Sequence, residues 1–265
     1  MTSEPFTNRT SMFPTLPIGP LRIQTFGLAL ILAYMAGLWL AARRGPRHGI
    51  DGDHIYNAGF YALLAGLVAA RLGHAAVYFE VYRTDPMQIL SLSPGAFLLL
   101  PGLLGGLLMV AIYLRRHRLS AVAFADAAAS GVLLALTIAA LGDFLAGRSL
   151  GALSNAPWAV ELFGVQRQPV ALFEAAATGG LLAFLLWLDN RKTLKPGQLA
   201  LLALFGYATI RLFSEPLHAD SMTVGDGWRL VQIAAMVVIA ICGWLLGRSA
   251  ARPRQTDADE PAAPV

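Results

Sequence analysis

The chain has 265 residues, of which 56% are hydrophobic and only 14% are charged, and its mean hydropathy is +0.58. This composition excludes an ordinary soluble domain and indicates an integral membrane protein. The net charge of +4 is not gathered in a basic run interleaved with aromatic residues, so we expect no nucleic acid partner and assign the charge to arginines at membrane ends. The one cysteine, Cys242, lies in an apolar run, which excludes a disulfide framework and favours packing.

Residues 1–19 are polar and rich in proline, and they lack the charged segment followed by an apolar segment that marks a signal peptide. We therefore expect a retained N-terminal arm. Residues 20–248 contain seven apolar runs, each close to the ~20 residues that cross a bilayer as a helix. These runs cover 23–42, 54–79, 97–114, 121–146, 170–188, 197–214 and 227–247. Residues 249–265 have almost no large apolar side chain, and we expect a disordered cytoplasmic tail.

The seven runs predict an all-α polytopic membrane protein with seven transmembrane helices around a central cavity. Lys and Arg in the connecting segments predict the orientation, because they are enriched on the cytoplasmic side of a membrane. The segments after the first, third, fifth and seventh helices hold twelve of these residues, against six on the opposite side. We therefore expect the N-terminus outside the cell, the C-terminus in the cytoplasm and a cavity open toward the outer leaflet.

Small residues indicate where helices approach one another closely. Glycines recur every seven residues in the second helix, from Gly59 to Gly73, and cluster at 102–106 in the third. In a bilayer such residues allow close helix packing, and a glycine-lined substrate cleft is the alternative reading. Pro101, beside the second group, is expected to kink or interrupt the third helix.

Five ionisable side chains are predicted at a similar depth in the outer half of the membrane: Arg71, Asp143, Glu174, Arg211 and Glu215. Charges inside a bilayer are costly unless they are paired or used, so charges brought to one depth by different helices indicate a shared polar cavity. The alternative is that Arg211 and Glu215, four residues apart, pair along their own helix while the others reach the interface.

Six segments with a characteristic residue order run through the chain. They read PIGPLRIQTFGLALILAYMAGLWLAARR, ARLGHAAVYF, PGLLGG, GDFLAGRSLG, RQPVALFEA and GYATIRLFSE. In this order, over residues 17–247, they resemble the motifs of the bacterial prolipoprotein diacylglyceryl transferase family. The fourth segment aligns without gaps to that family's signature GNFxNGExxG, and the last two are similar to its Arg-His-Pro-Ser-Gln-Leu-Tyr-Glu-Ala and Gly-Tyr-Gly-x-x-Arg-x-x-x-Glu segments.

Five departures from that family's motifs bear on the candidate site. Leu100 stands in place of a histidine before the glycine-rich run, and Ala140 stands in place of an arginine. The signature asparagine is Asp143, the signature glutamate is Arg148, and a first-helix tyrosine is Phe26. Seven family residues are retained, namely Arg71, Gly142, Gly151, Glu174, Tyr207, Arg211 and Glu215. The scaffold therefore matches the family better than the site does.

The resemblance implies transfer of a diacylglyceryl group from phosphatidylglycerol to the lipobox cysteine in the signal peptide of a prolipoprotein. This step of lipoprotein biosynthesis takes place at the bacterial plasma (inner) membrane. The peptide supplies the nucleophilic thiol, so the enzyme needs cationic donors for the phosphate and a group that takes up the thiol proton. The expected partners are these two substrates and the lipid bilayer, and we expect no metal and no organic cofactor.

The retained residues have expected roles under this resemblance. Arg71 and Arg211 hold the phosphate, and Glu174 and Glu215 orient the two guanidinium groups. Tyr207 lies one helical turn before Arg211, where its hydroxyl can hydrogen-bond the substrate or assist proton transfer.

The proton acceptor is open because the family histidine is absent, and Asp143 and His74 are the two candidates. His74 shares a helix face with Arg71 and is otherwise an interfacial residue. Arg148 is either an added phosphate contact, which compensates for the arginine lost at position 140, or a solvated loop charge. Gly142 and Gly151, the retained signature glycines, complete the candidate substrate-binding set.

Two alternative functions stay open. The departures from the family motifs fit a catalytically inactive homologue that binds lipid or lipoprotein. A lipid transporter is the other alternative, and an inverted internal repeat would favour it, although no repeat is visible in the seven runs. A proton acceptor close to Arg211 and Tyr207 would favour the enzyme over the inactive homologue.

Overall fold

The computed structural model describes residues 15–18, 21–85, 87–88, 97–162, 164–219, 223–224 and 228–251. Seven helices among these residues are long and apolar enough to cross a membrane. They are α1 (Thr25–Arg44), α2 (Gly52–Val77), α4 (Leu99–Arg116), α5 (Ala121–Leu145), α6 (Val170–Asn190), α7 (Gln198–Ser214) and α8 (Leu230–Ala251). The predicted all-α fold with seven transmembrane helices is confirmed, and the helix ends lie within four residues of the predicted ones.

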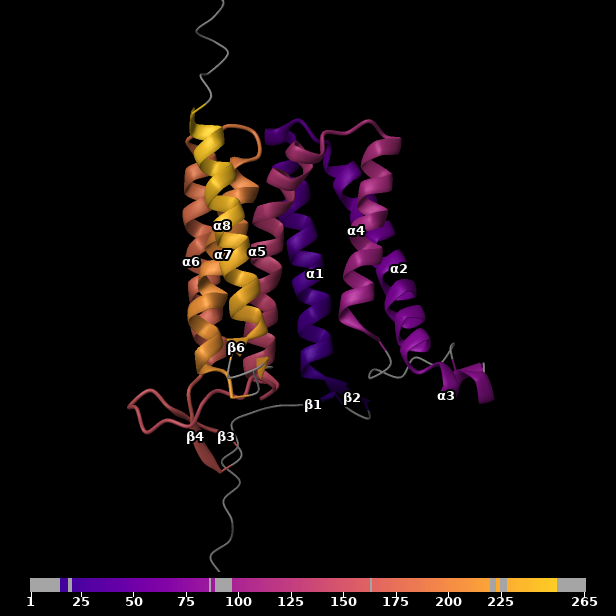
Figure 1. Ribbon diagram of the computed structural model, residues 1–265, viewed down its shortest axis with the longest axis vertical. Helices are drawn as coiled ribbons and strands as arrows, with labels where there is room; N and C mark the ends of the chain where they lie inside the picture. Colours follow the sequence, from indigo (N-terminus) through magenta and orange to yellow (C-terminus); the bar gives the residue numbers. More distant parts are fainter. Residues whose placement is uncertain are drawn as a thin grey trace, which may run out of the picture. The chain divides into compact units, whose positions relative to one another are not determined.

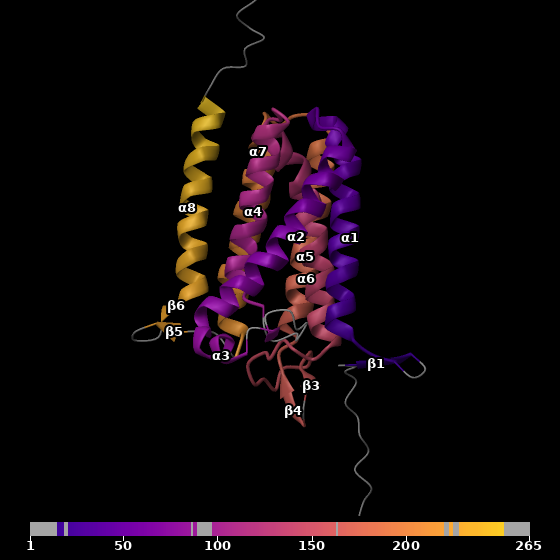
Figure 2. The same ribbon diagram turned by 90° about the vertical axis from the view of Figure 1, so that its right-hand side faces the viewer.

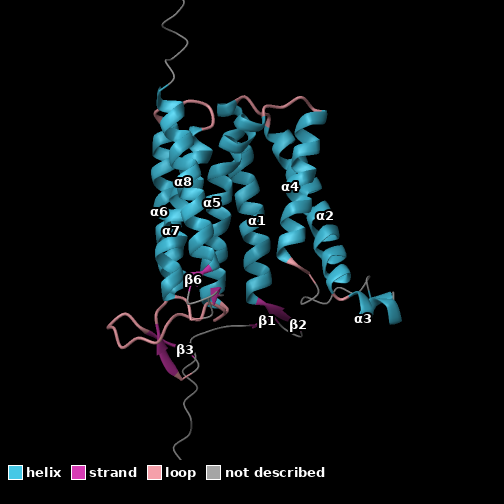
Figure 3. Cartoon of the chain, in the orientation of Figure 1, coloured by secondary structure: helices cyan, strands magenta, loops and turns pink. Residues whose placement is uncertain are grey.

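Short elements connect these helices (Figure 3). Three antiparallel strand pairs are formed by β1 (Thr15–Ile18) with β2 (Leu21–Gln24), β3 (Val160–Leu162) with β4 (Val165–Arg167), and β5 (Thr223–Val224) with β6 (Trp228–Arg229). One short helix, α3 (Phe79–Thr84), and two 3-10 turns, η1 (Gly45–His48) and η3 (Glu215–Leu217), complete the described elements. Most of the predicted arm and tail, residues 1–14 and 252–265, lie outside the described residues.

The chain forms two compact units. Unit 1 comprises residues 1–37 and 129–265, and in it α7 packs against both α6 and α8, which lie beside it in Figure 1. The start of α1 packs against α5 through glycines, because a Cβ added at Gly142 would collide with Ala29 and one at Gly37 would collide with the backbone of Gly131. The three strand pairs all lie at the end of unit 1 where α5 and α7 finish and where α1, α6 and α8 begin.

Unit 2 comprises residues 38–128 and is built on the pair α2 and α4. Their glycines face each other's backbone: a Cβ at Gly66 would lie 3.1 Å from the carbonyl oxygen of Gly102, and one at Gly106 would lie 3.2 Å from that of Ala62. The glycine-rich runs therefore serve close helix packing, as the first of the two readings predicted. Pro101 does not interrupt α4 as expected, because the helix begins at Leu99 and proline is tolerated in a first turn.

The other end of unit 2 holds a small apolar core around η1. Ala41, Ala42, Ile50, Ile55 and Ala127 are buried there, each 5% exposed or less. At the end where α2 finishes, a turn at Tyr78 leads into α3 (Figure 2). Helix α3 exposes Phe79 and Val81 but buries Tyr82, which is 7% exposed.

Candidate active site

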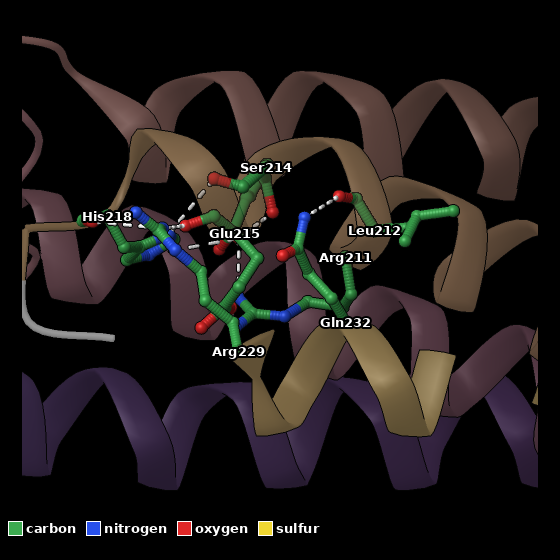
Figure 4. A network of polar contacts seen from close by, with 8 residues as sticks. Arg211, Leu212, Ser214, Glu215, His218, Arg229 and Gln232 are labelled. Atoms are coloured by element: carbon green, nitrogen blue, oxygen red, sulfur yellow. Dashed lines mark hydrogen bonds and ion pairs between the residues drawn. The ribbon is translucent and has the colours of Figure 1, made fainter. Parts of the chain in front are cut away.

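Arg211, near the end of α7, is the centre of a polar cluster in unit 1 (Figure 4). Its Nη1 donates to Oε1 of Glu174 on α6 at 2.5 Å, and its Nη2 donates to Oε2 of Glu215 at 2.6 Å. The side chains are 25%, 14% and 4% exposed, respectively. The predicted pairing of Arg211 with Glu215 along one helix is present, and Glu174 extends it to a second helix.

Neighbouring groups hold the two carboxylates in place. Oε1 of Glu174 also accepts a hydrogen bond from the Ser214 hydroxyl at 2.5 Å. The His218 ring lies beside the same oxygen, with Nε2 at 3.9 Å, while its Nδ1 is 3.3 Å from the backbone oxygen of Ser214. Because these contacts fix Glu174, the Arg211 guanidinium is held in one orientation.

Arg229 at the end of β6 and Gln232 in the first turn of α8 bind the end of α7 and the turn η3 that follows it (Figure 4). Nη1 of Arg229 donates to the backbone oxygens of Glu215 and His218, the latter at 3.3 Å, and Nε2 of Gln232 donates to the backbone oxygen of Leu212 at 3.4 Å. A guanidinium is favourable here because the last carbonyls of a helix carry partial negative charge. Sequence reasoning missed Arg229 and Gln232, since contacts to backbone oxygens leave no motif. It also missed Ser214, whose partner Glu174 lies 40 residues away in the chain.

Tyr207 lies on α7 one helical turn before Arg211, as predicted. The four-residue spacing puts Tyr207 and Arg211 on the same face of this helix. The Tyr207 hydroxyl has no hydrogen-bond partner among the described residues. Its donor and acceptor capacity is thus available to a ligand beside the Arg211 guanidinium.

Asp143 and Arg148 form an ion pair at the end of α5, with Nε of Arg148 3.6 Å from Oδ1 of Asp143. Helix α5 ends in a Schellman motif: Gly147 has φ +67°, its N–H binds the carbonyl oxygen of Phe144, and the Arg148 N–H binds that of Asp143. This motif folds Arg148 back over Asp143. The guanidinium also lies 3.8 Å from the ring centre of Phe26 on α1, a cation–π contact.

The two signature glycines serve close approaches of the chain. Gly142 faces Ala29 across the α1–α5 contact, and Gly151 lies against the backbone oxygen of Gln168, which a Cβ would overlap. The segment at Gly151 also pairs with η3, because the Ala152 N–H donates to Leu217 O at 2.7 Å. Close packing therefore explains why both positions are glycine, whether or not they also contact the substrate.

Arg71 and His74 belong to unit 2, near the end of α2. Arg71 is 7% exposed and donates to the backbone oxygen of Gln88, and its guanidinium lies 5.7 Å from the ring centre of Tyr82 and 5.5 Å from that of Phe97. Nδ1 of His74 is 2.9 Å from the Tyr82 hydroxyl. Tyr82 thus joins the two predicted residues, and sequence reasoning missed it.

The position of the absent family histidine is occupied by Leu100, which is 66% exposed in the first turn of α4. The position of the absent arginine is Ala140 on α5. Neither side chain can donate or accept a proton. Among the described residues, no three His, Cys, Asp or Glu side chains are grouped to hold a metal ion.

The fold and the cluster define a multi-pass membrane protein that carries a half-buried, arginine-centred polar site, the kind of site that binds anionic headgroups. The sequence profile of the prolipoprotein diacylglyceryl transferase family matches residues 14–248. The chain therefore belongs to this family, as its motifs predicted.

Relatives named phosphatidylglycerol–prolipoprotein diacylglyceryl transferase are similar to the chain over most of its length. The one from Thermosynechococcus vestitus is 29% identical over 245 residues, which cover 88% of this chain and 91% of the relative. Those from Chromohalobacter salexigens and Bacillus licheniformis are each 28% identical, over 86% of this chain and 90% and 89% of the relatives.

Proposed function

We propose that this chain transfers a diacylglyceryl group from phosphatidylglycerol to the lipobox cysteine of a prolipoprotein. Family membership and the names of the relatives support this reaction. The observation that carries the proposal is the Arg211 guanidinium, held between Glu174 and Glu215. Its two hydrogen bonds to these carboxylates leave three of its five N–H donors for a phosphate.

The reaction exchanges one bond at the glyceryl carbon. The peptide thiol loses its proton, its sulfur bonds to the carbon of the diacylglyceryl group, and the bond from that carbon to the phosphate oxygen breaks. The glycerol phosphate leaves with the electron pair. Because negative charge grows on that phosphate, oriented guanidinium groups lower the barrier.

The roles of the site residues follow from this chemistry. Arg71 and Arg211 bind the phosphate, and Arg148 adds a third cation where the family has glutamate. Tyr207 donates a hydrogen bond to the substrate or assists the proton transfer. Asp143 keeps Arg148 in place and is one of the two candidate proton acceptors.

The same proposal includes roles for three further residues and the orientation of the chain in the membrane. His74 is the second candidate proton acceptor, and Gly142 and Gly151 shape the backbone that borders the substrate. The site belongs to the 20–248 domain and takes its lipid from the outer leaflet of the bacterial plasma membrane. The arm over 1–19 is outside the cell and the tail over 249–265 is cytoplasmic, as the distribution of Lys and Arg indicates.

The test is transfer in vitro by the purified full chain in vesicles that contain phosphatidylglycerol labelled in its diacylglyceryl group. A lipobox peptide is the acceptor, and mass spectrometry of the cysteine detects the adduct. The same peptide with serine at that position is the acceptor control. Transfer to the cysteine peptide alone is expected, and its absence contradicts the proposal.

The Arg211→Lys variant tests the phosphate site. Lysine keeps the charge but cannot bridge two carboxylates and a phosphate as a planar fork does, so kcat/KM should fall about 100-fold, as when one oriented donor is lost from other active sites. The matched control is Arg83→Lys, whose ion pair with Glu80 is exposed on α3 and should leave transfer unchanged. Equal activity of both variants would exclude Arg211 from the phosphate site.

A second candidate function is a binding homologue without transfer activity, and the apolar residues Leu100 and Ala140 favour it. The same vesicles separate the two functions. A chain that retains labelled phosphatidylglycerol but forms no adduct has the binding function.

A further inference from the structure

His74, Tyr82 and Arg71 form a side-chain cluster at the end of α2 and the buried face of α3. Nδ1 of His74 and the Tyr82 hydroxyl are 2.9 Å apart, and the Tyr82 ring lies 5.7 Å from the Arg71 guanidinium. The ring of Tyr78 lies 4.5 Å from that of His74 and is tilted by 36°. The imidazole is thus held by a ring contact and a hydrogen bond.

The same cluster is close in the fold to Leu100, which stands at the position of the family histidine. Gly73, which precedes His74, touches Pro101, which follows Leu100, and the Leu98 N–H donates to the Ala70 carbonyl at 3.2 Å. Helix α2 therefore contacts the first turn of α4 within one residue of both positions. An imidazole on α2 can therefore replace the histidine that the family carries at the position of Leu100 on α4.

We infer that His74 is the proton acceptor for the peptide thiol and that Tyr82 is its positioning residue, an inference that rests on the proposed function. When Nδ1–H of His74 donates to the Tyr82 oxygen, the lone pair of the imidazole is on Nε2. Nε2 has no hydrogen-bond partner among the residues that the structure describes. The Tyr82 contact therefore orients the ring, and with Nδ1–H as its donor it leaves Nε2 as the proton acceptor.

The proton balance is complete with these residues. The S–H bond breaks, its proton bonds to Nε2, and the electron pair stays on sulfur, which then attacks the glyceryl carbon. The imidazolium that results passes its proton to the departing phosphate. Besides Tyr82, the ionisable groups near this imidazole are Tyr78, whose ring lies 4.5 Å away, and Arg71, three residues earlier on α2. Glu80 and Arg83 on α3 pair with each other on its exposed face.

The experiment measures kcat/KM for the peptide between pH 6 and pH 9 with the full chain in phosphatidylglycerol vesicles. A positioned base contributes about 10²–10⁴-fold, so His74→Gln should lower kcat/KM at least about 100-fold at pH 7. A thiol of pKa ~8.5 goes from about 3% to about 75% thiolate between pH 7 and pH 9, so the deficit should shrink by at least about 10-fold. Arg211→Lys should show no such recovery.

Tyr82→Phe keeps the ring next to Arg71 and removes only the hydroxyl. It should lower kcat about 10-fold at pH 7 with an unchanged KM for phosphatidylglycerol, because the imidazole loses the hydrogen bond that orients it. In the His74→Gln background it should have no further effect, because Tyr82 acts through His74. If Tyr82 had a purely structural role, Tyr82→Phe would lower kcat by the same factor in the wild-type and His74→Gln backgrounds, at every pH.

The chain offers a matched control at the opposite end of α2. Nδ1 of His54 and the Tyr113 hydroxyl are 3.0 Å apart, a second pair of the same kind. Twenty residues of helix separate His54 from His74, which is about 30 Å. His54→Gln and Tyr113→Phe should leave transfer and its pH profile unchanged.

The outcomes separate this inference from the proposed function. If the wild-type chain forms no adduct, the proposed function fails, and the role of His74 fails with it. If the wild type is active but His74→Gln loses activity equally at pH 7 and pH 9, only the proton-acceptor role is overturned. Full activity of His74→Gln at pH 7 would also overturn it and leave Asp143 as the remaining candidate.

Discussion

Replacement of Arg211 by alanine should destabilise the chain, because it leaves two carboxylates without the cation between them. Glu174 and Glu215 have side chains only 14% and 4% exposed, so water cannot take over the role of the guanidinium. Removal of one partner from a buried ion pair costs about 3–5 kcal/mol, and the 25% exposure of Arg211 places the cost near the lower end, about 3 kcal/mol. At ~2–4 °C per kcal/mol, Tm should fall by about 6–12 °C.

The assay is thermal unfolding of the purified chain, followed by intrinsic fluorescence at a single scan rate. A second variant, Arg211→Ala with Glu174→Gln, removes one of the two carboxylate charges and should recover about half of the loss, since the other charge, on Glu215, remains. Arg83→Ala is the control, because its pair with Glu80 is exposed and worth no more than about 1 kcal/mol.

Two results would refute the reasoning. If Arg211→Ala and Arg83→Ala both melt close to the wild-type temperature, water solvates the two carboxylates of the cluster and Arg211 is not needed to stabilise them. If the added Glu174→Gln change lowers Tm further, Glu174 contributes through other contacts, such as its hydrogen bond from Ser214, more than through Arg211.

Three other outcomes are expected. Asp143→Asn restores the family residue and should keep at least wild-type transfer in the vesicle assay, whereas complete loss would make this carboxylate the base. Gly151→Ala should lower Tm by several degrees, because a Cβ there overlaps the Gln168 carbonyl, while Gly180→Ala, with open space around its Cα, should leave Tm unchanged or raise it. Gly105→Leu should cut the amount of folded chain in membranes severalfold, measured by fluorescence-detected size-exclusion chromatography, because that glycine touches an alanine of α2.

The helices could be predicted from the sequence because a bilayer imposes length and composition on every segment that crosses it. Even the start of α5 at Ala121 and of α6 at Val170 agree with the predicted residues. The strand pairs and α3 were not predicted. Strands of two to four residues outside the bilayer are too short to show a period, and their pairing depends on neighbouring elements.

The candidate site was predictable where family motifs or helix spacing placed residues together, as for Arg211 with Glu215. The resemblance placed Glu174 beside one of the two guanidinium groups, but only the structure shows that it binds Arg211, which is 37 residues away in the chain. Arg229 and Tyr82 carried no signal, since one binds backbone oxygens and the other lies in a segment that read as a loop. The departure at Arg148 was visible, but only the Schellman end of α5 explains why it meets Asp143.

Helices α2 and α4 pack together although they differ in length, with 26 and 18 residues. At 1.5 Å per residue they are about 39 Å and about 27 Å long, whereas the hydrocarbon core measures about 30 Å. Helix α4 matches that core, and α2 can match it only by tilting or by extending past it. The end of α2 carries Arg71 and His74, so hydrophobic mismatch couples their depth to the acyl chains around them. Under the proposed roles of these residues, membrane thickness affects the reaction, and vesicles of longer or shorter lipids should change the rate of transfer.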